Sequence, residues 1–133
     1  MREQTILVAD DQMFIRRIIS DYLENANYHV MEAKNGREAL ELFCTNQQTI
    51  DLVILDIMMP ELDGLEVCER IRDISSVPVI MLTASDDDNN EIKGLRLGVD
   101  EYMKKPFDNK ELVQIVNRLL GNSNTQNQNV INL

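Results

Sequence analysis

The sequence predicts an α/β fold in which helices cover both faces of a parallel β-sheet. Short apolar runs of strand length alternate with segments whose apolar residues recur at helical spacing. The alternation occurs five times with short connections, which is typical of a doubly wound parallel sheet. The run from Leu52 to Leu55 is unbroken, as expected for a strand buried on both faces. We therefore expect a (βα)5 three-layer sandwich.

The predicted strands are short, and the last is more polar than the others, which favours a place at a sheet edge. They cover Thr5–Ala9, His29–Ala33, Leu52–Asp56, Val79–Thr83 and Glu101–Lys104.

The predicted helices follow these strands, and each has an apolar face. Their apolar residues run from Phe14 to Leu23, from Ala39 to Phe43, from Leu65 to Ile71, from Ile92 to Leu97 and from Leu112 to Leu120. Asp108 precedes the last helix and is a residue type that caps helix N-termini.

Composition limits the possible functions. The 133 residues suffice for one domain with a buried core. The net charge of −10 argues against direct binding to nucleic acid or to an anionic membrane. The chain begins with a short polar segment before the first strand, and its two cysteines form no CxxC motif. These features predict a cytoplasmic protein without a signal peptide, with both cysteines reduced and part-buried.

Polar side chains stand where the predicted strands end. In a doubly wound sheet a ligand binds outside the carboxyl ends of the strands. Asp10 and Asp11 follow the first strand, Asp56 ends the third, Thr83 ends the fourth and Lys105 follows the fifth. We therefore expect these five residues to form one site.

These residue types suit the transfer of a phosphoryl group. Two carboxylates about 4 Å apart repel by roughly 4 kcal/mol at an effective dielectric constant of about 20, so either some of the acids stay protonated or a cation lies among them. Oxygen ligands with room for water favour Mg²⁺. Lys105 adds a positive charge and Thr83 a hydroxyl group. Asp56 would then be the nucleophile that accepts the phosphoryl group.

Four motifs in order resemble the receiver domain of two-component response regulators, of the chemotaxis-regulator type. The resemblance extends from Thr5 to about Leu120. The motifs are Asp10-Asp11, Asp56-Ile57-Met58-Met59-Pro60 with Asp63-Gly64, Leu82-Thr83-Ala84, and Lys105-Pro106-Phe107.

The resemblance implies a flavodoxin-like sheet with strand order 2-1-3-4-5. It also implies that a sensor histidine kinase phosphorylates Asp56 with the help of Mg²⁺, for which Mn²⁺ could substitute. The metal would be bound by Asp11 directly, by Asp10 through water, by Asp56 and by the backbone carbonyl of Met58. Lys105 and Thr83 would bind the phosphoryl oxygens, and the Lys105-Pro106 bond would be cis.

The same resemblance makes Thr83 and Tyr102 a switch pair. Thr83 would move toward the phosphoryl group and Tyr102 would turn inward, while the small Ala84 leaves access to the site. The fourth helix, fifth strand and fifth helix would then change their surface and support a phosphorylation-dependent homodimer.

The end of the chain suggests a larger protein. We expect a receiver domain over residues 1–121 and a polar linker, or the start of a removed output domain, over 122–133. Similar receivers often precede a winged-helix DNA-binding domain, which would be the only part to contact DNA. Glu91 and Ile115 stand where that subfamily usually has basic residues, so a stand-alone regulator or a cyclase-type output stays open.

Other interpretations explain single features. Asp10-Asp11 could cap a helix, Asp86-Asp87-Asp88 most simply forms a solvated helix start, and His29 is expected to be structural. An aspartyl-nucleophile phosphatase would need an acid where Met58 stands. A flavin-binding module would not place two acids in its phosphate loop. A receiver used as a phosphorylation-independent interaction module would not need the complete set of acids, hydroxyl and lysine, but this alternative stays open. We expect no enzymatic activity beyond self-phosphorylation and self-dephosphorylation.

Overall fold

The computed structural model describes residues 3–84 and 93–122, and its centre is one sheet of five parallel strands. The strand order is β2-β1-β3-β4-β5, with β5 at an edge, as predicted. The strands are β1 (Thr5–Ala9), β2 (His29–Ala33), β3 (Ile50–Asp56), β4 (Val79–Thr83) and β5 (Glu101–Lys104).

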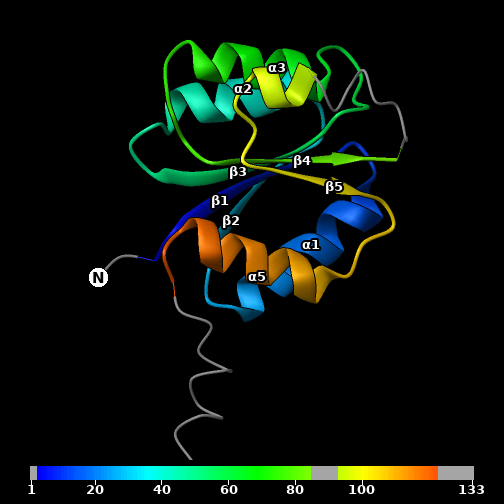
Figure 1. Ribbon diagram of the computed structural model, residues 1–133, viewed down its shortest axis with the longest axis vertical. Helices are drawn as coiled ribbons and strands as arrows, with labels where there is room; N and C mark the ends of the chain where they lie inside the picture. Colours follow the sequence, from blue (N-terminus) through cyan, green and yellow to red (C-terminus); the bar gives the residue numbers. More distant parts are fainter. Residues whose placement is uncertain (1–2, 85–92, 123–133) are drawn as a thin grey trace, which may run out of the picture.

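Helices cover both faces of this sheet (Figure 1). They are α1 (Met13–Asn25), α2 (Gly36–Thr45), α3 (Gly64–Arg72) and α5 (Asn109–Leu119), and residues 93–96 are also helical. In Figure 1, α2 and α3 lie on one side of the strands, and α1 and α5 lie on the other. The doubly wound, flavodoxin-like α/β architecture is therefore confirmed.

Alternate strand residues build two separate cores, one on each face of the sheet. In β1, Leu7 and Ala9 pack in the cluster that contains Phe43 of α2. Ile6 and Val8 pack in the cluster that contains Leu23 of α1. Every residue of β1 is buried, which explains why the first strand reads as a continuous apolar run.

The predicted strand bounds are confirmed except at the start of β3. That strand begins at Ile50, two residues before the predicted Leu52. Ile50 pairs with Thr5 of β1, and Asp51 Oδ2 accepts a hydrogen bond from the Thr5 backbone N–H at 2.8 Å. The Asp51 side chain thus accepts the hydrogen bond of the Thr5 N–H where the register between β1 and β3 is irregular. This polar residue therefore belongs to β3, although the sequence suggested that the strand begins after it.

Side-chain caps fix the starts of three helices. Asp63 accepts from the Glu66 N–H at 2.9 Å, and the Glu66 carboxylate accepts from the Asp63 N–H, which completes a capping box for α3. Asp108 caps α5 through the Lys110 N–H, as predicted, and Asn35 caps α2. The capping box ends the loop after β3 next to the carboxyl edge of the sheet.

Arg72 joins the end of α3 to the opposite, amino edge of the sheet. Its guanidinium donates to the carbonyl oxygens of Val77 at 2.7 Å, Gly98 at 2.9 Å and Leu97 at 3.1 Å. Asp100 pairs with the same guanidinium at 3.4 Å and accepts from the backbone N–H of Val79 at 2.8 Å. The Arg72 side chain therefore binds both the segment that leads into β4 and the segment that leads into β5.

Several sequence-based expectations concern other parts of the chain. Both cysteines are free, but the expected partial burial is wrong: Cys68 is buried and Cys44 is exposed. Within residues 3–84 and 93–122, no helix has the length and hydrophobicity needed to cross a bilayer. The acidic run 86–88, Glu91 and the tail from residue 123 lie outside the described residues.

We predict that Gly64→Ala destabilises the fold. A Cβ atom at Gly64 would lie 2.4 Å from the backbone oxygen of Asp56, which is closer than real Cβ contacts. The strand or α3 must shift, so the free energy of unfolding should fall by about 1–3 kcal/mol in urea denaturation. Gly94→Ala is the matched control because its Cβ would meet Tyr102 Cδ2 at an ordinary 3.5 Å. Equal losses in the two variants would contradict the prediction.

Candidate functional site

Three carboxylates gather at the carboxyl edge of the sheet, where β1 and β3 lie side by side. Ala9 pairs with Leu55, so Asp10 and Asp56 each follow a paired residue. Asp10, Asp11 and Asp56 each offer an oxygen, and these oxygens lie within 4.8 Å of one another. The structure thus brings together the three acids that the sequence singled out.

Asp10 is fully buried, and each of its polar groups has a partner. Its N–H donates to the Ala33 carbonyl at 3.2 Å, and its carbonyl accepts from Arg16 Nη1 at 2.8 Å. Its Oδ1 accepts from the Gln12 N–H at 2.9 Å, and its Oδ2 accepts from Lys105 Nζ at 2.9 Å. The position and the orientation of this carboxylate are therefore both fixed.

Lys105 supplies the positive charge of the site. Its Nζ lies 2.9 Å from Asp10 Oδ2 and 3.4 Å from Asp56 Oδ2. The loop after β5 is held to β4 because the Lys105 N–H donates to the Thr83 carbonyl at 2.6 Å. The Lys105-Pro106 bond is cis, as predicted. One ammonium group thus forms ion pairs with two carboxylates, one after β1 and one at the end of β3.

Asp56 lies at the centre of the cluster with 4% of its surface exposed. Burial raises the pKa of this carboxyl to about 6, and the negative charge of Asp10 adds to the rise. The Lys105 ammonium and the Met58 N–H, 3.4 Å from Asp56 Oδ1, oppose it. At neutral pH most of the molecules therefore carry an ionised Asp56 that is more basic than an ordinary aspartate.

Thr83 and Tyr102 lie on the same face of the sheet. Leu82 pairs with Asp56, so the fully buried Thr83 follows directly beside the acidic cluster. Tyr102 pairs with Met81, two residues before Thr83, and paired residues of parallel strands project to one face. Tyr102 is partly buried against the core on that face. It is not part of the acidic cluster. The role of Thr83 and Tyr102 as a switch pair stays a prediction.

Met58 and His29 also lie where the sequence suggested. The Met58 side chain is 65% exposed, while its N–H faces Asp56. The role of its carbonyl as a metal ligand stays a prediction. His29 is exposed at the start of β2, which is the edge of the sheet opposite the carboxyl ends.

Arg16, Gln12 and Glu32 are site components that the sequence did not reveal. Arg16 and the Gln12 N–H bind Asp10, and Glu32 binds Arg16 at 2.9 Å. Arg16 is on the first turns of α1 and Glu32 precedes the last residue of β2. Their charges were visible in the sequence, but the contact depends on how α1 packs across β2.

The donor set fits a small divalent cation. Asp10 and Asp56 are buried, whereas Asp11 is exposed and keeps one side of the cluster open to water. With all three acids ionised, Lys105 leaves two negative charges uncompensated in the cluster. Mg²⁺ prefers oxygen ligands and retains water in its shell, which matches these residues.

We predict that Asp56 lowers stability at neutral pH in metal-free solution. Its folded-state pKa of about 6 lies above the ordinary 3.8, so the folded protein binds this proton more tightly than the unfolded chain. Its contribution to stability therefore falls as the pH rises from about 4 to about 6. Asp56→Asn should raise the free energy of unfolding by on the order of 1–3 kcal/mol at pH 7.5, and less at pH 4.5. Urea denaturation in a chelator checks this, and a pH-independent difference would contradict it.

Known proteins resemble this chain in sequence and in structure. Residues 6–117 match a family model described as the response regulator receiver domain. The probable transcriptional regulator ycf27 of Porphyridium aerugineum is 43% identical over all of this chain and 58% of its own length. The transcriptional regulatory protein ResD of Bacillus subtilis is 42% identical over 97% of this chain and 56% of its own.

A crystal structure of a response regulator receiver domain protein from Clostridium thermocellum superposes with a TM-score of 0.84. Its sequence is 34% identical, and the match covers 89% of this chain and 94% of that one. The chain spans about half the length of the curated relatives it matches. The family model, the curated relatives and the structural match agree, and the chain belongs to the receiver domain family of two-component response regulators.

Proposed function

We propose that this domain accepts a phosphoryl group on Asp56 from a sensor histidine kinase and thereby controls transcription. Receiver domains partner with histidine kinases and bind Mg²⁺ at an acidic pocket. The observation that carries the assignment is the buried Asp56 carboxylate, held between the Lys105 ammonium and two further acids at the carboxyl edge of the sheet. Asp56 is the one acid of the cluster that ends the central strand.

The chemistry needs a nucleophile and a means to neutralise charge. An oxygen of the ionised Asp56 attacks phosphorus, the bond from phosphorus to the kinase histidine breaks, and an aspartyl phosphate forms. Lys105 pairs with a phosphoryl oxygen, and the Thr83 hydroxyl donates to another. Asp10, Asp11, Asp56 and the Met58 carbonyl would hold Mg²⁺, or Mn²⁺ in its place. That ion supplies charge neutralisation at the transferring group.

The reaction stays on the domain's own carboxylate. A phosphatase that uses an aspartate nucleophile would need an acid where Met58 stands, and the exposed thioether of Met58 cannot transfer a proton. We therefore assign no enzymatic activity beyond phosphorylation and dephosphorylation of Asp56. Among the described residues, His29 is remote from the site and offers no general base.

The surface beside the acids supports docking of a protein partner. Met13 and Phe14 at the start of α1 are 66% and 75% exposed, and Met58 is 65% exposed. These residues follow Asp10 and Asp56 closely in the chain. Exposed apolar side chains next to a charged pocket are typical of a protein interface. We propose that the histidine kinase that delivers the phosphoryl group binds at this surface of Met13, Phe14 and Met58.

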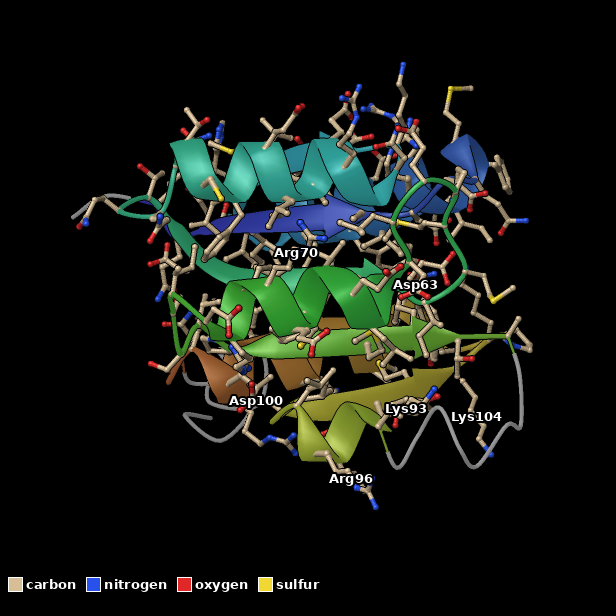
Figure 2. The ribbon with its side chains drawn as sticks, turned by 90° about the horizontal axis from the view of Figure 1, so that it is seen from above. Asp63, Arg70, Lys93, Arg96, Asp100 and Lys104 are labelled. Atoms are coloured by element: carbon tan, nitrogen blue, oxygen red, sulfur yellow. The ribbon has the colours of Figure 1, made fainter. Side chains whose placement is uncertain are left out.

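The output surface is proposed to comprise residues 93–96, β5 and α5, with Thr83 and Tyr102 as the switch pair. Figure 2 labels Lys93, Arg96, Asp100 and Lys104, which are spread along the β5 edge of the sheet, with Asp100 before the start of β5 and Lys104 at its end. Both charge signs occur on this edge, so two copies related by a two-fold axis can place unlike charges opposite one another. This arrangement supports a phosphorylation-dependent homodimer.

The whole protein is proposed to be a transcription factor whose receiver occupies residues 1–121. The relatives named above are transcriptional regulators about twice as long as this chain. Residues 122–133 would then be a linker or the start of an output domain, and DNA would be bound only by that domain. A domain that serves a sensor kinase works in the cytoplasm, where we place the protein.

Phosphorylation of Asp56 is the central prediction. The full chain, incubated with Mg²⁺ and acetyl phosphate, should gain the mass of one phosphoryl group, whereas Asp56→Asn should gain none. Asp51→Asn is the matched control, since Asp51 lies on the same strand at the opposite edge. Intact-mass spectrometry measures the adducts. No adduct on wild type, or an equal adduct on Asp56→Asn, would refute the assignment.

The switch pair is tested separately through the oligomeric state. Tyr102→Ala should still be phosphorylated at a rate within about threefold of wild type, because the ring is outside the acidic cluster. It should lose the phosphorylation-dependent dimer in size-exclusion chromatography with light scattering. Tyr22→Ala on the exposed side of α1 is the control and should dimerise normally. Normal dimerisation of phosphorylated Tyr102→Ala would separate Tyr102 from the switch.

A further inference from the structure

Arg16 connects the acidic cluster to the second strand. Its Nη1 donates to the Asp10 carbonyl at 2.8 Å, and its Nε donates to Glu32 Oε1 at 2.9 Å. The Arg16 side chain is 13% exposed and that of Glu32 is 21% exposed, so both contacts are partly shielded from water. A planar guanidinium with donors at fixed angles can hold both partners at once.

The carbonyl that Arg16 binds belongs to the peptide between Asp10 and Asp11. That peptide is planar, so a fixed carbonyl fixes the plane that joins the two acidic residues. The Asp10 side chain is already held by Gln12 and Lys105. The hydrogen bond from Arg16 therefore restrains the peptide group that precedes Asp11, and with it the backbone that carries the exposed Asp11 side chain.

Arg17 provides an internal comparison. Its Nη1 also binds Glu32, at 2.7 Å, but its side chain is 56% exposed and its contacts are to Glu32 and Asp21. The neighbouring arginines therefore share an anionic partner and differ in the contact with Asp10. The pairing with Glu32 also offsets the positive charge of Arg16, which would otherwise oppose the binding of a cation nearby.

We propose that Arg16, anchored by Glu32, is a positioning residue that orients Asp10 and Asp11 for a divalent cation. This inference rests on the proposed function, which requires that cation at the acidic cluster. In this proposal Arg16 acts through the Asp10 carbonyl and does not itself bind the ion or the phosphoryl group. Outer partners of this kind commonly change metal affinity by about 10–100-fold when they are replaced.

Arg16→Lys tests the proposal because it preserves the positive charge and removes the planar guanidinium group that donates to two partners. A single ammonium on a flexible stem cannot hold Glu32 and the Asp10 carbonyl in fixed directions. Isothermal titration of the full chain with MgCl₂ should show a dissociation constant about tenfold higher than that of wild type. Arg17→Lys, with the same charge and the same Glu32 partner, should stay within about twofold of wild type.

Two further measurements separate positioning from a general loss of structure. In acetyl phosphate reactions, Arg16→Lys should need about tenfold more Mg²⁺ for half-maximal phosphorylation and should recover most of the maximal rate at saturation. A lower melting temperature in chelator, with an unchanged Mg²⁺ dissociation constant, would assign Arg16 a structural role only and overturn the inference. Equal affinities of Arg16→Lys and Arg17→Lys would overturn it as well.

The same experiments distinguish the two proposals. If wild type takes up no phosphoryl group but Arg16→Lys still binds Mg²⁺ tenfold more weakly than wild type, the proposed function fails and the positioning role is supported. If wild type is phosphorylated on Asp56 and Arg16→Lys behaves like wild type, the proposed function is supported and the positioning role is refuted. If wild type binds no Mg²⁺, the positioning role is refuted.

Discussion

The repulsion among three carboxylates at one edge of the sheet is the constraint on which the site depends. Their oxygens lie within 4.8 Å of one another, and two of the three acids are buried. Lys105 offsets part of this charge by bonding to both Asp10 and Asp56. Burial, together with the negative charge of Asp10, raises the pKa of Asp56, and the uncompensated charge favours the binding of a divalent cation. Energy that destabilises the metal-free protein is thus available to drive ion binding.

The fold supports this cluster by restraining backbone as well as side chains. Asp10 is held through its N–H, its carbonyl and both carboxylate oxygens. Gly64 lets the start of α3 approach the Asp56 carbonyl, and the capping box at Asp63 fixes the residue at which α3 begins. The backbone around the Asp56 carboxylate is therefore restrained, and group transfer is faster when the reacting groups are held in a fixed geometry.

Most of the fold and the acidic cluster could be predicted from the sequence. Strands buried on both faces give continuous apolar runs, and parallel strands place their carboxyl ends at one edge, so Asp10, Asp56 and Lys105 could be grouped without coordinates. The start of β3 was missed because Asp51 is a polar residue that completes a backbone hydrogen bond. The apolar period of α1 included Phe14, which is exposed. Periodicity identifies a helix and its apolar face. A residue at the end of that face, such as Phe14, can nevertheless be exposed because the core does not extend to it.

The role of Arg16 could not be predicted for a different reason. It depends on three elements at once, because the side chain leaves α1, binds β2 and reaches the end of β1. Arg16 and Arg17 are chemically identical and adjacent, so no local pattern distinguishes them. Their difference lies in exposure, 13% against 56%, which is set by how the helix packs on the sheet.

Arg72 has a consequence for how movement can spread through the domain. It binds the carbonyls of Leu97 and Gly98 at the amino edge of the sheet, far along the chain from the reactive carboxylate. The helical residues 93–96 are therefore anchored at their carboxyl end. If Thr83 moves on phosphorylation as proposed, this anchor favours a rotation of residues 93–96 about their carboxyl end over a translation along β5. In the proposed switch, a contact at the edge of the sheet where no chemistry occurs would therefore constrain the direction of the movement.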